Sequence, residues 1–196
     1  MMNIEIEAKL RLQDVEAMHA RLAELEAVRD REIHETNTYF DLPEGRLKST
    51  DQGLRIRVER EVEAQRTRTL ITHKGPRSHG KFKSRTETET VVENARTAEA
   101  LLVALGYHRL LTFEKRRTRY LLGDCRVEID TLPYLGTFIE IEGDRDEAVT
   151  GVLEQLGLSG QPLIRASYVA MLSAHLREQG LEETHVRLPR PAAVAG

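Results

Sequence analysis

Several segments of the chain carry a charged residue at every second position, and these residues are the first candidates for chemistry. Glu5, Glu7 and Lys9 alternate with aliphatic residues near the start of the sequence. Because successive side chains of a strand point to opposite faces, these three charges share one face of an extended segment. The same alternation recurs in five further segments. It predicts a charged sheet face with the carboxylates of Glu5, Glu7, Glu128, Asp130, Glu140 and Glu142 and the cations of Lys9, Arg55, Arg57, Lys74, Arg85, Lys115 and Arg117.

The two kinds of charge favour two kinds of ligand. Carboxylate oxygens are hard ligands that suit Mg²⁺ or Mn²⁺ rather than zinc. Lysine ammonium groups and the planar guanidinium groups of arginine suit phosphate oxygens. Acidic and basic side chains that line one cavity therefore indicate a site for a divalent metal together with a polyphosphate.

A simpler interpretation is an antiparallel sheet with one face in water, where alternating charges are ordinary. Six segments share the pattern here, however, and charges of the same sign recur as close pairs. If the sheet closes, the charged face becomes the lumen of a barrel. A purely structural network of lumen ion pairs remains an alternative. Burying such charges, however, costs more free energy than their attraction returns, so a function is the expected reason for keeping them.

Strands are the elements that must position these charges, and turn-forming Gly, Pro and Asp residues separate them. Apolar residues three and four positions apart predict the helices, and Thr97 is the predicted N-cap of the second one. The fold class is α+β, mainly β, with helices packed on the outer, aliphatic face. The predicted strands cover residues 3–11, 36–41, 54–61, 66–74, 82–92, 109–119, 122–131 and 135–143, and the predicted helices cover about 13–28, 97–105, 149–156 and 168–180.

Composition limits the classes of function. The 196 residues predict a single domain over residues 1–183 and a disordered tail over residues 184–196. The longest apolar run is too short to span a membrane, and the lone Cys125 excludes an internal disulfide, so we expect a cytoplasmic protein. The net charge of −3 argues against a general nucleic-acid binder. Residues 55–85 nevertheless hold ten Lys or Arg against three Glu, and this local excess predicts an anionic ligand.

The charged motifs follow one another in a specific order over residues 3–176. They include Glu5-Ile6-Glu7-Ala8-Lys9, Thr38-Tyr39-Phe40-Asp41, Leu54-Arg55-Ile56-Arg57, Lys74-Gly75-Pro76, Arg85-Thr86-Glu87, Lys115-Arg116-Arg117, Glu128-Ile129-Asp130, Phe138-Ile139-Glu140-Ile141-Glu142 and Ser167-Tyr168. This ordered set resembles the CYTH superfamily of class IV adenylyl cyclases and thiamine triphosphatases, also called triphosphate tunnel metalloenzymes. The segment 135–142 and Lys74-Gly75-Pro76 are most similar to the prokaryotic branch named for class IV cyclases.

The resemblance implies a closed eight-stranded antiparallel β-barrel, or triphosphate tunnel, that binds a triphosphate with Mg²⁺ or Mn²⁺. It implies metal ligation by Glu5, Glu7, Glu140 and Glu142, with Asp130 as a further ligand. It implies triphosphate contacts by Lys9, Arg55, Arg57, Lys74, Lys115 and Arg117, to which the charge pattern adds Arg85.

Membership of such a family does not identify the reaction, because the reaction depends on the residues of the site and not on the fold. We expect a metal-dependent phosphohydrolase acting on tripolyphosphate, ATP or thiamine triphosphate, with Tyr39 and Lys74 as candidates for proton transfer. The alternatives are an adenylyl cyclase that makes cyclic AMP and pyrophosphate from ATP, and a non-catalytic polyphosphate or nucleotide binding protein. The oligomeric state stays open, although homodimers are common in the family that the chain resembles, and neither nucleic acid nor a membrane is an expected partner.

Overall fold

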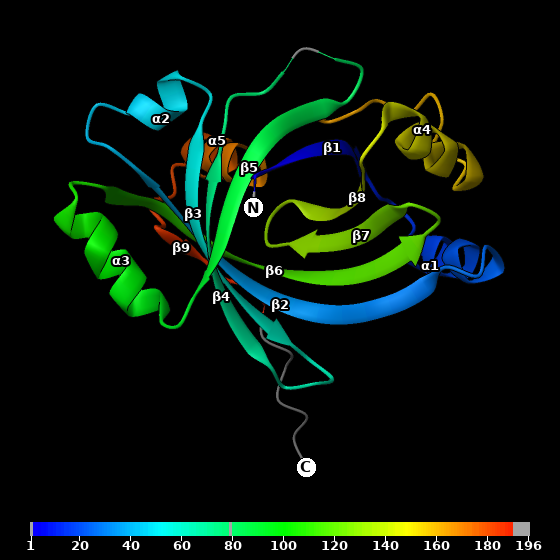
Figure 1. Ribbon diagram of the computed structural model, residues 1–196, viewed down its shortest axis with the longest axis horizontal. Helices are drawn as coiled ribbons and strands as arrows, with labels where there is room; N and C mark the ends of the chain where they lie inside the picture. The colour runs from blue at the N-terminus through cyan, green and yellow to red at the C-terminus, as the bar shows by residue number, and fades with distance from the viewer. Residues whose placement is uncertain (1, 79, 190–196) are drawn as a thin grey trace.

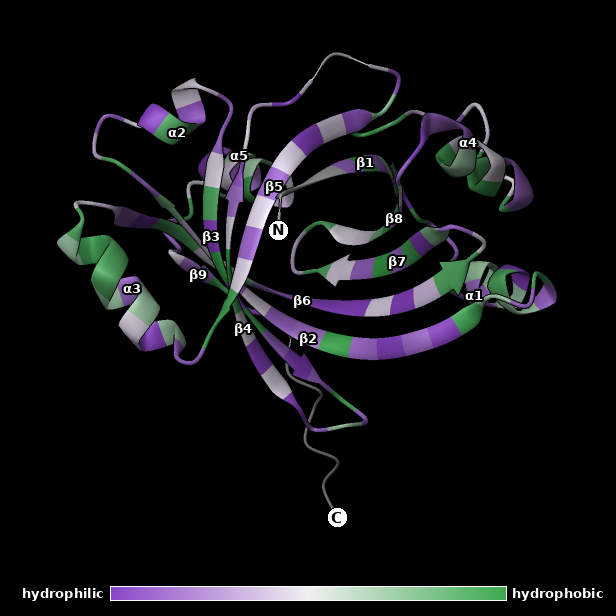
Figure 2. Cartoon of the chain, viewed as in Figure 1, coloured by the Kyte–Doolittle hydropathy of each residue, from purple (hydrophilic) through white to green (hydrophobic). Residues whose placement is uncertain are grey.

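Nine strands form the sheet of this protein, whose computed structural model describes residues 2–78 and 80–189. Hydrophobic and hydrophilic residues alternate along strands such as β6 and β7, as Figure 2 shows. The strands are β1 (Met2–Arg11), β2 (Val28–Asp41), β3 (Gly53–Glu61), β4 (Thr67–Lys74), β5 (Lys83–Val92), β6 (His108–Leu122), β7 (Cys125–Leu132), β8 (Gly136–Gly143) and β9 (His185–Val186).

Eight of the strands close into an antiparallel barrel (Figure 1). Their spatial order is β2-β3-β4-β5-β1-β8-β7-β6, and a long antiparallel pairing between β2 and β6 joins the two edges. Closure leaves these strands without a free edge and turns one face of the sheet inward. The predicted closed eight-stranded antiparallel barrel is confirmed.

Three helices cover the outer face of the barrel. Helices α1 (Val15–Glu24) and α4 (Asp146–Gln155) pack their apolar sides on β1, β7 and β8, where Leu22 and Val149 are fully buried. Helix α3 (Ala95–Ala104) places Leu102 against Phe40, Leu54 and Ile56 of β2 and β3. The charged side chains of the same strands point the other way, so the aliphatic face supplies the stability and the charged face supplies the site.

Helix α5 (Tyr168–Glu178) is not on the outer face, and it corrects the expectation that every helix lies outside. Its Tyr168, Leu172 and Leu176 pack with Phe113 of β6 and Phe138 of β8. These two phenylalanines lie on the same strand faces as Lys115 and Glu140, two residues further along, and that face is the lumen. Helix α5 therefore closes one end of the barrel on an apolar layer.

Two predicted boundaries differ from the structure near the start of the chain. The helix predicted over residues 13–28 ends at Glu24, because Glu26 adopts a left-handed backbone with φ of 54° and the Ala27 amide donates back to the Leu22 carbonyl. The strand predicted over residues 36–41 begins at Val28. Residues 28–35 carry charges on both faces, so hydrophobic alternation could not identify them as a strand.

Local contacts correct three further expectations. The N-cap of α3 is Asn94, whose side chain accepts the Thr97 amide proton, so the prediction of Thr97 as the cap was wrong. A single helical turn, α2 (Arg46–Ser49), was not predicted. Part of the predicted disordered tail is ordered, since β9 pairs in parallel with β6 and the Thr112 amide donates to the Thr184 carbonyl. Residues 190–196 lie outside the described residues.

Candidate active site in the barrel lumen

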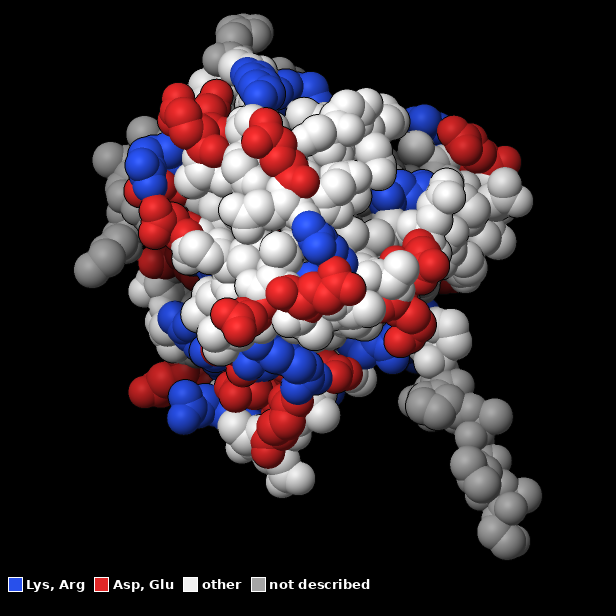
Figure 3. All heavy atoms as spheres, turned by 90° about the vertical axis from the view of Figure 1, so that its right-hand side faces the viewer, with Lys and Arg blue, Asp and Glu red and all other residues white. Residues whose placement is uncertain are grey.

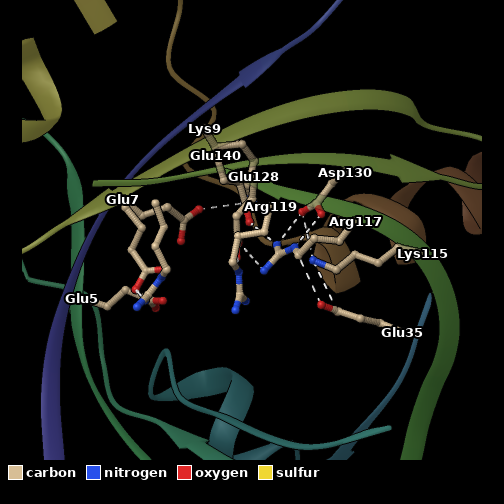
Figure 4. Close-up of polar contacts among 12 residues, drawn as sticks. Glu5, Glu7, Lys9, Glu35, Lys115, Arg117, Arg119, Glu128, Asp130 and Glu140 are labelled. Atoms are coloured by element: carbon tan, nitrogen blue, oxygen red, sulfur yellow. Dashed lines mark hydrogen bonds and ion pairs between the residues drawn. The ribbon is translucent and has the colours of Figure 1, made fainter. Parts of the chain in front are cut away.

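The lumen contains a cavity of about 1090 Å³ that runs from the charged interior of the barrel to α2 and α5. Every predicted site residue except Asp130 lines it. Figure 4 shows Glu5 and Glu7 on one side of the lumen and Lys115 and Glu35 on the other, with Arg117 between them. The predicted residues that line the cavity are Glu5, Glu7, Lys9, Tyr39, Arg55, Arg57, Lys74, Arg85, Lys115, Arg117, Glu140 and Glu142.

Positive charge predominates around this cavity. Among the described residues that line it, fourteen are Lys or Arg and ten are Asp or Glu, although the whole chain is acidic. The outer face over α1 and α4, by contrast, mixes acidic, basic and uncharged side chains (Figure 3). The positive excess in an enclosed space favours a polyanionic ligand.

Carboxylates gather where β1 and β8 pair. Glu7 lies directly opposite Glu142 in the strand register, and like charges in that position repel each other. Burial, the neighbouring charges of Glu5 and Glu128 and a hydrogen bond with Glu5 raise the pKa of Glu142 to about 9. Glu7 Oε1 is buried and accepts no hydrogen bond from any described residue. Crowded hard oxygen donors of this kind fit a divalent cation such as Mg²⁺ or Mn²⁺.

The carboxylates are not gathered into a ready-made metal cluster within the described part of the chain. Each of three candidate ligands turns instead toward a cation of the lumen. Glu7 Oε2 accepts a hydrogen bond from Lys83 Nζ at 2.7 Å, Glu140 Oε1 lies 3.2 Å from Lys9 Nζ, and Glu142 pairs with Arg126. The carboxylate oxygens are therefore of the kind that a divalent metal prefers, but ion pairs with lumen cations hold these carboxylates.

Arg117 is the most heavily paired cation of the lumen. Its Nε and Nη2 atoms donate to the two oxygens of Asp130 at 2.7 and 2.6 Å, and Nη2 also donates to Glu140 Oε2 at 2.7 Å. Its Nη1 pairs with Glu128. The guanidinium group is thus held in place by three buried carboxylates.

Lys9 links the carboxylates to the end of the barrel that α5 closes. Its ammonium group donates to the Ala166 carbonyl at 3.1 Å and lies 4.0 Å from the centroid of the Tyr168 ring. Burial alone raises the pKa of Glu140, the partner of Lys9. The charges of Lys9 and Arg117 outweigh this effect and lower the pKa well below its usual range. Glu140 is therefore an ionised, hydrogen-bonded carboxylate.

Arg55 and Arg85 are the least paired cations near the centre of the lumen. The Nε atom of each is buried and has no hydrogen-bond partner among the described residues. Arg55 donates from Nη2 to Thr72 Oγ1 at 3.2 Å and lies 3.7 Å from Glu89. A buried donor without a hydrogen-bond partner costs free energy, so these two guanidinium groups favour the binding of an anionic ligand to which they can donate.

The two predicted proton-transfer residues lie near each other at the cavity wall. Lys74 pairs with Glu87, opposite it in the register, and lies 3.8 Å from Glu5 Oε2. Tyr39 stacks on Phe113 with ring centroids 6.0 Å apart. Burial alone raises the pKa of Tyr39, but the surrounding cations, Arg55 and Lys74 first among them, lower it below its ordinary value.

A fully buried carboxylate, Glu35 of β2, belongs to the site and was missed by the sequence analysis. Its Oε2 lies 3.2 Å from Arg57 Nε and 3.4 Å from Lys115 Nζ. Burial alone raises its pKa, yet Arg57, Lys115 and Arg117 lower it well below the usual range. Glu35 lies one residue before the predicted strand 36–41, and extending that strand by one residue would have placed it on the lumen face.

Asp130 lies behind the cavity wall, fully buried, with both oxygens bonded to Lys115 and Arg117. This position favours a role in orienting two cations over the predicted metal ligation. Glu35 and Asp130 together form a second row of negative charge behind the cations.

Asp130→Asn is therefore expected to lower kcat/KM for a triphosphate by about tenfold through misplaced cations. The metal concentration for half-maximal activity should stay within about twofold of the wild-type value. Kinetic assays across a metal titration measure both quantities. A large rise in the metal requirement with an unchanged KM would instead establish Asp130 as a metal ligand.

Comparisons with known proteins agree with this geometry. The chain is 32% identical over 174 residues to the adenylate cyclase CyaB of Aeromonas hydrophila, covering 84% of this chain and 86% of that protein. The PH1819 protein of Pyrococcus horikoshii has the same fold, with a TM-score of 0.77 and 27% identity over 87% of this chain and 99% of that one. HpAC1 of Hippeastrum, described as having a dominant triphosphatase activity, superposes with a TM-score of 0.62 at 22% identity, over 91% and 97% of the two chains.

No helix in the described part of the chain is long and apolar enough to cross a membrane. The CYTH domain profile matches residues 3–168, which include every predicted site residue described above. CYTH proteins are enzymes that act on triphosphates and generally depend on a metal. The chain belongs to the CYTH family.

Proposed function

We propose that this protein is a divalent-metal-dependent phosphohydrolase that binds the triphosphate group of its substrate in the barrel lumen. The observation that carries the proposal is the presence of both kinds of charged group in one cavity. Carboxylates of β1 and β8 line it together with cations of β1, β3, β5 and β6. A linear triphosphate chelated to a metal matches both kinds of group at once.

Three groups of residues would bind the metal, bind the phosphates and transfer the proton. Glu5, Glu7, Glu140 and Glu142 would hold the metal, which supplies Lewis-acid activation of the phosphate group. Arg55 and Arg85 offer buried unpaired donors to phosphate oxygens, and Lys9, Arg57, Lys115 and Arg117 neutralise the remaining charge. Lys74 and Tyr39 also line the cavity, and we propose them as the groups that transfer a proton.

Adenylyl cyclase activity is the second candidate function, and two observations favour it. The relative CyaB is named as an adenylate cyclase. Apolar residues also line the cavity, among them Leu47 of α2 and Val169 and Ala170 of α5. A nucleoside attached to the triphosphate would pack against residues of this kind.

A substrate panel separates these functions. Purified protein is incubated with tripolyphosphate, thiamine triphosphate, ATP or GTP and either Mg²⁺ or Mn²⁺, and phosphate, pyrophosphate and cyclic nucleotide are measured. Phosphate release from at least one triphosphate supports the hydrolase. Pyrophosphate and cyclic AMP formed from ATP in equal amounts support the cyclase. Binding without turnover under all conditions would leave a binding protein.

The affinity of the lumen should rise steeply with phosphate chain length. With Ca²⁺ as a non-productive metal, tripolyphosphate should bind at least about tenfold more tightly than pyrophosphate, because the added phosphate gains charge-assisted hydrogen bonds. Calorimetry at moderate ionic strength measures both affinities. Equal affinities, or binding abolished by modest salt, would indicate an exposed anion patch instead of an enclosed triphosphate site.

A further inference from the structure

The residues that would bind the metal and those that would bind the phosphates are paired with each other in the ligand-free lumen. Glu140 bonds to Lys9 and Arg117, and Glu7 bonds to Lys83. The side chains of Lys9, Arg117, Lys83, Glu7 and Glu140 are each at most 11% exposed, so little water screens these contacts. The internal carboxylates occupy the same cations that a phosphate would need.

Each of the two ligands alone would break such a pair at a cost. A phosphate that takes Lys9 and Arg117 would leave the buried Glu140 carboxylate without a counter-charge. A metal that takes Glu140 would leave Lys9 with only the longer contact to Glu7 Oε1, 3.7 Å away, and would remove one of the carboxylates that neutralise Arg117. Removing one partner of a buried ion pair is strongly unfavourable, because the remaining charge stays buried and unpaired.

We infer that Glu140 and Glu7 make metal and triphosphate binding mutually dependent, so that the lumen accepts the metal–triphosphate complex as one ligand by an exchange of ion-pair partners. This inference rests on the proposed function of the same site. In the exchange, Glu140 and Glu7 pass from Lys9, Arg117 and Lys83 to the metal, and these cations pass to the phosphate oxygens. The charges stay balanced only when both ligands arrive together.

The coupling is reciprocal, because a metal that raises the affinity for the anion must gain affinity from the anion by the same factor. Arg55 and Arg85 do not take part in the exchange, since their buried Nε atoms have no partner to give up among the described residues. They would provide a first contact for the anion, and the carboxylate-bound cations would complete the site.

The inference predicts opposite effects of one substitution under two conditions. Tripolyphosphate is titrated calorimetrically in buffer freed of divalent metal by a chelating resin, and again with Ca²⁺. In Glu140→Gln, the metal-free affinity should be at least about fivefold higher than in the wild type, because Lys9 and Arg117 lose their internal competitor. With Ca²⁺, the affinity of the same variant should be at least about fivefold lower, because a metal ligand is lost.

Glu89→Gln is the matched control. Glu89 also lines the cavity and contacts Arg55, but it is not among the proposed metal ligands. Removing its charge should shift the affinity in the same direction in both buffers. Glu7→Gln, which frees Lys83, should repeat the reversal seen for Glu140→Gln and replaces it if circular dichroism shows that Glu140→Gln is unfolded.

The outcomes are distinct. Reversal of sign in Glu140→Gln or Glu7→Gln, and not in Glu89→Gln, supports the exchange. Changes of the same sign in both buffers for these variants, or equal wild-type affinities with and without Ca²⁺, overturn it while leaving the triphosphate site in place. No binding by the wild type in either buffer would overturn the proposed function itself.

Discussion

Replacing Glu142 with glutamine is expected to lower kcat on the best triphosphate substrate by at least about 100-fold while the barrel stays folded. Glu142 lies opposite Glu7, beside Glu5 and Glu128, among the carboxylates that gather where β1 and β8 pair. The substitution removes a carboxylate of the proposed metal-ligand set but keeps the size of the side chain. Steady-state assays at saturating Mg²⁺ or Mn²⁺ measure the change.

The melting temperature should be maintained or should rise in the same variant. Burial and the neighbouring charges of Glu5 and Glu128 disfavour the ionised form of Glu142 and raise its pKa, and neutral glutamine carries no such penalty. Glu63→Gln, on the exposed pair with Arg29, serves as the control and should leave both activity and stability near the wild-type values. Wild-type turnover in Glu142→Gln would remove this residue from the metal site.

Replacing Arg55 with alanine should cost about 2–4 kcal/mol in kcat/KM, if its phosphate contact tightens in the transition state. The fold should be largely unaffected, because within the described residues Arg55 makes one hydrogen bond, to Thr72, and one long contact, to Glu89. Kinetic measurements and denaturant unfolding of the same preparation separate the two effects.

Arg117→Ala provides the contrast. Arg117 holds Glu128, Asp130 and Glu140, so its removal takes a shared counter-charge from three buried carboxylates and should lower the free energy of unfolding by about 3–5 kcal/mol. Arg57, which pairs with the buried Glu35, should behave like Arg117 in this respect. A large stability loss in Arg55→Ala without a kinetic effect would instead favour the purely structural ion-pair network.

The sequence by itself determined which side chains share one face of each predicted strand. A strand alternates its side chains with a period of two wherever it lies, so the positions of Glu5, Glu7 and Lys9 on one face followed from local geometry alone. The ordered motifs then indicated the family and with it the closed barrel. The list of predicted lumen residues therefore agrees with the cavity wall everywhere except at Asp130.

The tertiary structure alone decided which of these charges face each other. Strand register sets Glu7 opposite Glu142, Lys9 opposite Glu140 and Arg117 opposite Asp130, and no periodicity within one strand contains that information. The depth of Asp130 and the inclusion of Glu35 depend on the closure of β2 on β6. The position of α5 across one end of the barrel likewise depends on an apolar layer built from distant strands.

The physical reason for this division is the range over which each interaction acts. Side-chain alternation is a property of neighbouring residues, whereas an ion pair in a closed lumen joins residues such as Lys9 and Glu140 that are far apart in the chain. The sequence therefore specified which charged residues are the candidates for metal and phosphate binding. Only the folded barrel showed that, without ligands, the members of that set neutralise one another.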